Sequence, residues 1–151
     1  MNKIIYIDFD GVLVDTPRLI NKAIKINGSS DDVCKNFPWK YFLQNCDEIE
    51  DNFSYIMKIA KKYKVVILTH VYSDKERFEK EKYILNKLHG VAVISVPYFI
   101  EKNDIVNPKG NILIDDYENN INKWKKSGGI GIYMSDEKRL DKLLNEYLIK
   151  L

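Results

Sequence analysis

Five short apolar runs, rich in isoleucine and valine, recur along the chain. They occupy residues 3–9, 64–69, 91–96, 111–114 and 130–133. Because the runs are continuous rather than alternating, they are typical of strands that are buried on both faces of a parallel sheet. Segments with the helical period of about 3.6 residues lie between and after them. These helical segments occupy residues 18–26, 47–62, 74–88, 117–127 and 136–151.

Strands that alternate with helices predict an α/β protein, a Rossmann-like three-layer α/β/α sandwich around a parallel sheet of about five strands. One segment, residues 16–48, does not follow this alternation. It contains a turn at residues 27–30 and four aromatic side chains around a proline, namely Phe37, Trp39, Tyr41 and Phe42. We interpret this segment as a small helical cap, inserted after the first strand into a core of residues 1–15 and 49–151.

The composition excludes several classes of protein. The chain has 151 residues and 45% hydrophobic content, which suits one globular domain. Its net charge of +2, from 24 basic and 22 acidic residues, argues against nucleic acid as a partner. No apolar run approaches the ~20 residues of a membrane span, and the first strand follows the N-terminus too closely for a signal peptide. We therefore expect a cytoplasmic protein without a membrane partner, whose oligomeric state the pattern leaves open.

Polar residues follow three of the predicted strands directly. Asp8 and Asp10 end the first run, the pair Asp115 and Asp116 ends the fourth, and Thr69 ends the second. In parallel α/β sheets, ligands bind outside the carboxyl ends of the strands. We therefore expect these side chains to meet in one crevice.

The four aspartates are suited to phosphoryl transfer at a metal ion. Mg²⁺ prefers hard oxygen ligands, which Asp8, Asp10, Asp115 and Asp116 could provide. An aspartate can also attack phosphorus and form an aspartyl-phosphate, and a second acid can protonate the leaving alkoxide. We expect Asp8 to be the nucleophile and Asp10 to be the acid, and later the base that activates water.

The remaining parts of a phosphate site are a hydroxyl group and a lysine. Thr69 is expected to bind a phosphate oxygen, and His70 either contacts the substrate beside it or caps the following turn. Lys102 and Lys109 both lie in the 101–110 loop and compete for the cationic role. We favour Lys102, because it follows an apolar segment at the edge of the expected cleft.

The same segments resemble the haloacid dehalogenase-like (HAD) phosphohydrolases. The resemblance rests on Asp-Phe-Asp-Gly-Val-Leu-Val-Asp at 8–15, Ile-Leu-Thr at 67–69, a lysine, and Ile-Leu-Ile-Asp-Asp at 112–116. It implies a magnesium-dependent phosphatase with a small helical cap over a Rossmann-like sheet.

Within that superfamily, Asn119, Trp124 and the Gly-Gly-Ile-Gly-Ile run at 128–132 look most like the 5′-nucleotidase, or deoxyribonucleotidase, branch. This resemblance implies hydrolysis of nucleoside (deoxy)monophosphates through an aspartyl-phosphate. The cap aromatics Phe37, Trp39 and Tyr41 would then be candidates to stack on a nucleobase, although such a cluster can also form a small core.

Other functions are compatible with the same residues. The substrate could be another small phosphorylated metabolite or the 3′ end of a nucleic acid. A HAD-fold module that binds nucleotides without turnover is a further alternative.

Overall fold

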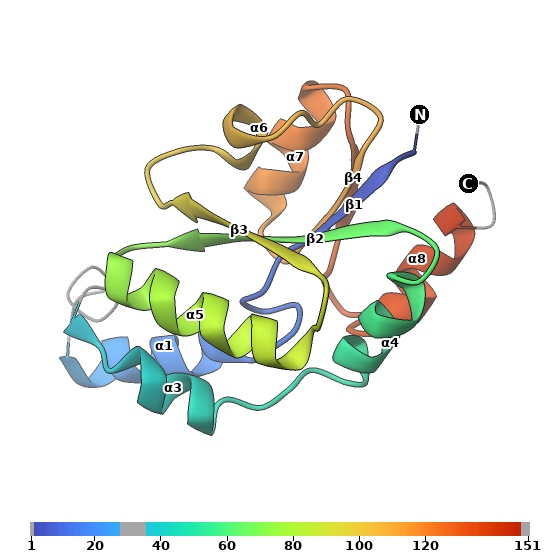
Figure 1. The fold of residues 1–151 in the computed structure, drawn as a ribbon. Coiled ribbons are helices and arrows are strands. Elements are labelled where there is room, and N and C mark those ends of the chain that lie inside the picture. Colours follow the sequence, from blue (N-terminus) through green and yellow to red (C-terminus); the bar gives the residue numbers. More distant parts are fainter. Residues whose placement is uncertain (1, 28–35, 149–151) are drawn as a thin grey trace.

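The computed structural model describes residues 2–27 and 36–148. Within these residues, five parallel strands form one sheet in the order β3-β2-β1-β4-β5 (Figure 1). The strands are β1 (Ile4–Ile7), β2 (Lys64–Val71), β3 (Ala92–Pro97), β4 (Ile112–Asp115) and β5 (Ile130–Tyr133). The predicted α/β/α sandwich is thereby confirmed, and each predicted run contains the core of one strand.

Helices cover both faces of the sheet (Figure 1). They are α6 (Lys102–Ile105) and α7 (Glu118–Lys126) on one face, and α4 (Asn52–Ile59), α5 (Asp74–Lys87) and α8 (Leu140–Leu148) on the other. Because successive strand residues point to opposite faces, Ile5 and Ile7 join the larger core beneath α4, α5 and α8. Tyr6 joins a smaller core, where its ring lies 5.4 Å from that of Trp124 on α7.

Two local features of the helices were not predicted. Ser73 is the N-cap of α5, and its hydroxyl oxygen accepts the N–H of Glu76. The segment between β3 and β4 was expected to be a loop, yet it contains the single-turn helix α6. Among the described residues, no helix combines the length and the apolar character that a membrane span requires.

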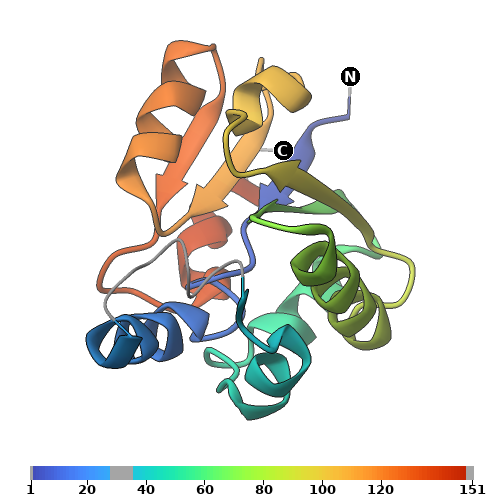
Figure 2. The same ribbon diagram turned by 90° about the vertical axis from the view of Figure 1, so that its left-hand side faces the viewer.

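The insertion after β1 contributes two described helices, α1 (Thr16–Asn27) and α3 (Trp39–Asn45). They lie in front of the carboxyl ends of the strands, on the α5 side of the sheet (Figure 2). The backbone N–H of Asp15 donates to the carbonyl of Asp47 at 2.8 Å, and that of Ile49 donates to the carbonyl of Leu13 at 2.9 Å. The chain therefore leaves and re-enters the core at one place.

The aromatic cluster of the insertion forms a small core. Trp39 is only 1% exposed and packs with Phe42 and Ala23, and Phe37 is half-buried against this group. Of the two alternatives for this cluster, Trp39 therefore fits the small core, because neighbouring side chains cover the indole. Tyr41 points outward and is 62% exposed.

Candidate active site

Side chains alternate between the two faces of a strand, and this places two of the acids on the same face of the sheet. Tyr6 and Leu113 point into the core beneath α7, so Asp8 and Asp115, two residues further along the same strands, face the same side. The N–H of Asp8 donates to the carbonyl of Ile114 at 2.9 Å. Asp8 and Asp115 are therefore immediate neighbours at the carboxyl ends of two adjacent strands.

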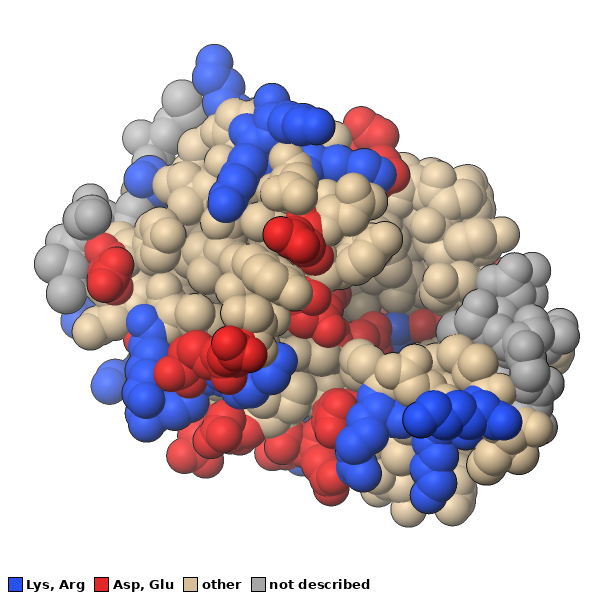
Figure 3. Space-filling view, turned by 180° about the vertical axis from the view of Figure 1, so that it is seen from behind, with Lys and Arg blue, Asp and Glu red and all other residues tan. Residues whose placement is uncertain are grey.

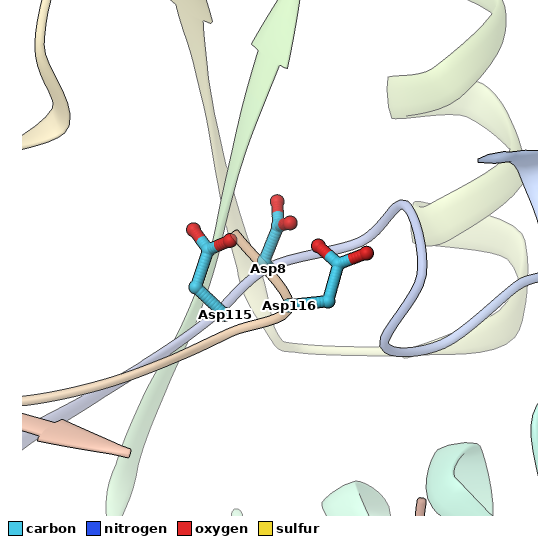
Figure 4. Close-up of side chains that lie close together, drawn as sticks. All are labelled: Asp8, Asp115 and Asp116. Atoms are coloured by element: carbon cyan, nitrogen blue, oxygen red, sulfur yellow. The ribbon is translucent and has the colours of Figure 1, made fainter. Parts of the chain in front are cut away.

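Three carboxylates converge at this point. One ligand oxygen from each of Asp8, Asp115 and Asp116 lies within 4.8 Å of the other two. All three side chains extend to the same side of the backbone that carries them (Figure 4). Asp10, which we expected to be a fourth ligand, is not in this cluster, because its carboxylate lies among other partners. Three clustered carboxylate oxygens are a donor set that fits Mg²⁺.

A buried lysine spans two of these acids. Lys102, 2% exposed, places its Nζ 2.8 Å from Oδ1 of Asp8 and 2.7 Å from Oδ2 of Asp115. It lies in the first turn of α6, the short helix that the pattern did not predict. Lys109 is exposed and lies beside Gly128 instead. Of the two competing lysines, the structure thus brings Lys102 to the acids.

Asp115 is held in place by the start of α7. Its Oδ1 accepts the backbone N–H of Tyr117 at 2.8 Å, and its Oδ2 accepts Nδ2 of Asn120 at 2.9 Å. Sequence reasoning did not select Asn120. The signal available was its position, one helical turn beyond an acidic strand end.

The electrostatics of the cluster favour a cation. Burial raises the pKa of Asp8 well above its ordinary value and Asp115 adds to the rise, while Lys102 opposes it. Burial, then Asp115 and Asp10, raise the pKa of Asp116 to about 6. One lysine therefore does not compensate the gathered negative charge, and a divalent ion would favour the ionised form of each carboxylate.

Asp10 lies in a second group of side chains, on the α5 side. Its Oδ1 accepts the hydroxyl of Thr16 at 2.5 Å. Its Oδ2 accepts Nζ of Lys80 at 2.6 Å and the hydroxyl of Thr69 at 3.4 Å. Thr69 is thus at the site as expected, whereas neither Thr16 nor Lys80 was assigned to it from the sequence.

His70 is engaged with the main chain. Its Nε2 lies 2.8 Å from the carbonyl oxygen of Ile100, in the segment that leads to Lys102. Burial lowers the pKa of His70, and Lys102 lowers it further. The neutral ring is suited to holding the 98–101 segment beside the acids, and a contact of His70 with the substrate stays a prediction.

A hollow in the surface contains acidic side chains. Figure 3 shows them between two parts of the molecule that carry lysine and arginine on their outer surfaces.

No protein-family model matches the chain, and no curated protein matches its sequence. Solved structures, however, match its fold. A haloacid dehalogenase-like family hydrolase from Streptococcus pneumoniae has a TM-score of 0.60 at 14% identity, covering 95% of this chain and 90% of that one.

Two further structures agree with this result. A HAD family enzyme from Bacteroides thetaiotaomicron, in complex with magnesium and inorganic phosphate, has a TM-score of 0.59 at 12% identity, covering 95% of this chain and 99% of that one. A HAD-superfamily hydrolase from Geobacter sulfurreducens has a TM-score of 0.57 at 11% identity, covering 87% and 86%. The chain therefore has the fold of HAD-superfamily hydrolases, as the sequence motifs implied.

Proposed function

We propose that the protein is a magnesium-dependent phosphomonoesterase. The observation that carries the proposal is the meeting of Asp8, Asp115, Asp116 and Lys102 at the carboxyl ends of β1 and β4. The HAD hydrolases of the same fold support it, and one of them was solved with magnesium and inorganic phosphate. Asp8, Asp115 and Asp116 would hold the ion, which would neutralise charge on the phosphoryl oxygens.

The side chains have the chemistry for two successive displacements. A carboxylate oxygen of Asp8 would form a bond to phosphorus while the ester P–O bond breaks, and Asp10 would give its proton to the leaving alkoxide. Asp10 would then take a proton from water, whose oxygen attacks the aspartyl-phosphate, releases phosphate and restores Asp8. The ammonium of Lys102 would stabilise the charge on the transferred group, and the hydroxyl of Thr69 would bind one of its oxygens.

For the substrate, we propose nucleoside (deoxy)monophosphates. The sequence resemblance to the deoxyribonucleotidase branch supports this choice, and so do aromatic rings that remain exposed. Phe99 is 74% exposed and Tyr98 46% exposed in the segment between β3 and Lys102, and Tyr41 is 62% exposed on the insertion. Exposed aromatic faces are suited to stacking on a base.

The test is phosphate release from a panel of substrates, with and without Mg²⁺. The panel contains ribo- and deoxyribonucleoside monophosphates, small sugar phosphates and a 3′-phosphorylated oligonucleotide. We expect Mg²⁺-dependent turnover that is fastest with nucleoside monophosphates, and a loss of at least ~10³-fold in Asp8→Asn, because an amide cannot form the acyl phosphate.

Each alternative predicts a different result. If a sugar phosphate or the oligonucleotide releases phosphate fastest, the protein belongs to another class of phosphatase. Nucleotide binding without any turnover would indicate a non-catalytic module. Full activity of Asp8→Asn would rule out Asp8 as the nucleophile.

A further inference from the structure

The buried face of α5 carries charge where a helix that covers a sheet normally carries apolar side chains. The buried residues of α5 are Glu76, Lys80 and Ile84, one helical turn apart, and the first two are each 1% exposed. Two apolar residues of the same helix point outward instead, since Phe78 is 62% exposed and Leu85 is 49% exposed. The helix is therefore turned so that a glutamate and a lysine face the strand ends.

The ammonium group of Lys80 has three oxygen atoms within hydrogen-bonding distance. Its Nζ lies 2.6 Å from Oδ2 of Asp10, 2.6 Å from Oε1 of Glu76 and 3.1 Å from the carbonyl oxygen of His70. A lysine has three N–H donors, so each can be assigned an acceptor. Burial disfavours the charged lysine, but Asp10 and Glu76 outweigh this effect and raise its pKa, so the group is a cation at neutral pH.

This network is not explained by stability. A buried ion pair often contributes no more to folding than apolar residues of similar volume, because desolvating the charges offsets their attraction. Glu76 is further tied to the backbone, since its Oε2 accepts the N–H of Tyr72 at 2.8 Å. The arrangement fixes the position of one ammonium group, and that group contacts Asp10.

Asp10 is consequently held at both carboxylate oxygens. Thr16 donates to Oδ1, while Lys80 and, at longer range, Thr69 donate to Oδ2. These contacts are those of the ionised carboxylate, the form that takes a proton from water in the second displacement. A residue that gives and later takes a proton must present one oxygen along a narrow set of directions, so an orientation fixed from both sides matters for proton transfer.

We propose that Lys80 is a positioning residue of the active site, which holds the Asp10 carboxylate in the orientation required for proton transfer, and that Glu76 holds Lys80 in turn. The inference rests on the proposed function, in which Asp10 protonates the leaving group.

The same contacts connect the insertion to the acid. Nζ of Lys80 lies 5.1 Å from the ring centroid of Trp39 on α3, and Thr16, the other partner of Asp10, is the first residue of α1. Asp10 is therefore oriented by groups that belong to, or pack against, the insertion.

The test measures the first chemical step with two kinds of leaving group. Single-turnover release of the alcohol is compared for a nucleoside monophosphate, whose alkoxide needs a proton, and for p-nitrophenyl phosphate, whose nitrophenolate does not. General acids contribute about 10²–10⁴-fold. We expect Lys80→Met to slow nucleoside release by about 10²-fold and nitrophenolate release by about tenfold or less.

Matched variants define the cause. Lys82→Met removes an exposed lysine from the same helix and should change neither rate. Lys80→Arg keeps the charge and should recover part of the nucleoside rate. Glu76→Gln keeps Lys80 but weakens the ion pair that holds it. This variant should slow nucleoside release more than nitrophenolate release, as Lys80→Met does, but by a smaller factor. It replaces Lys80→Met in the test if that variant does not fold.

Two results would overturn the inference. The first is an equal loss with both substrates, which would indicate a purely structural lysine. The second is a crystal structure of a Lys80 variant in which the Asp10 carboxylate keeps its orientation and its contact with Thr16. This second measurement does not depend on activity. If the wild-type protein releases no phosphate from any ester, the proposed function fails. Comparing the orientation of Asp10 in crystal structures of the wild-type protein and of the Lys80 variant still decides whether Lys80 positions it.

Discussion

At the level of single residues, the cluster of Asp8, Asp115 and Asp116 brings together carboxylates that repel one another when they are ionised. Burial and neighbouring carboxylates raise the pKa of Asp8 and Asp116. Ionisation of these groups in the folded protein is therefore costly, and it becomes favourable when a divalent cation binds. In the proposed function, metal binding and proton release would thus be coupled at this site.

This coupling predicts a pH-dependent response to Mg²⁺. The pKa of Asp116 is about 6 in the fold, above the ordinary aspartate value. A raised pKa means that the folded protein holds this proton more tightly than the unfolded chain, so its contribution to stability is lost as pH rises through about 6. In EDTA, we expect Tm to fall between about pH 4 and 6.5, from the unfolded to the folded pKa of Asp116, and to level off above this range. Mg²⁺ should restore it, by on the order of 5 °C at the higher pH and less at the lower pH.

Differential scanning fluorimetry across this pH range measures both effects. Asp116→Asn is the control, because an amide does not ionise, and it should weaken both the pH dependence and the response to Mg²⁺. An equal Mg²⁺ shift at both pH values would contradict the coupling.

At the level of elements, the turn after β1 brings its backbone against the cluster of Asp8, Asp115 and Asp116. Gly11 has φ +76°, and a Cβ atom at this position would lie 1.9 Å from Oδ2 of Asp116. The turn therefore requires glycine both for its backbone conformation and for the space that the carboxylate occupies.

A pair of glycine variants separates these two requirements. Gly90 has nearly the same conformation, φ +78°, with nothing within 4 Å of its Cβ position. We expect Gly90→Ala to cost about 1–2 kcal/mol of stability from backbone strain alone and to leave activity unchanged. Gly11→Ala should show similar strain, and in addition should lower Mg²⁺-dependent activity at least tenfold by displacing Asp116.

Urea denaturation and phosphate release at increasing Mg²⁺ concentration measure the two effects separately. The idea fails if Gly11→Ala has normal activity and a normal Mg²⁺ requirement.

At the level of the whole molecule, the insertion lies in front of the carboxyl ends of the strands (Figure 2), and the segment 98–101 joins β3 to the helix that carries Lys102. Phe99 and Tyr98 lie in this segment, which His70 holds through Ile100. Two of the exposed aromatic rings thus belong to the segment that also delivers Lys102 to the site.

We predict that Phe99 contributes to recognition of the base. Stacking of a base on an aromatic ring is worth about 1–3 kcal/mol. Phe99→Ala should therefore raise KM for nucleoside monophosphates by roughly 5- to 100-fold and leave kcat/KM for a small sugar phosphate unchanged. Phe78→Ala is the matched control, because Phe78 is also an exposed phenylalanine, 62% accessible, on the outer face of α5. Equal losses on both substrates would count against base recognition.

Much of the fold was predictable because burial leaves a local pattern. Continuous apolar runs located all five strands, and the parallel topology then required Asp8 and Asp115 to lie at the same edge of the sheet. The position of an acid after a strand is a property of neighbouring residues alone. For that reason, the candidate site could be located before any contact was known.

The tertiary structure decided what depends on distant partners. Lys102 and Lys109 both remained candidates in the sequence, which favoured Lys102 only through the apolar segment before it. The contact itself comes from α6, which places Lys102 between two acids. Glu76 and Lys80 have the spacing of an ordinary exposed helical ion pair, so nothing local indicates that they are buried. A charged side chain becomes part of a site when the fold removes water from it and supplies an opposite charge, and that charge comes from residues far away in the chain.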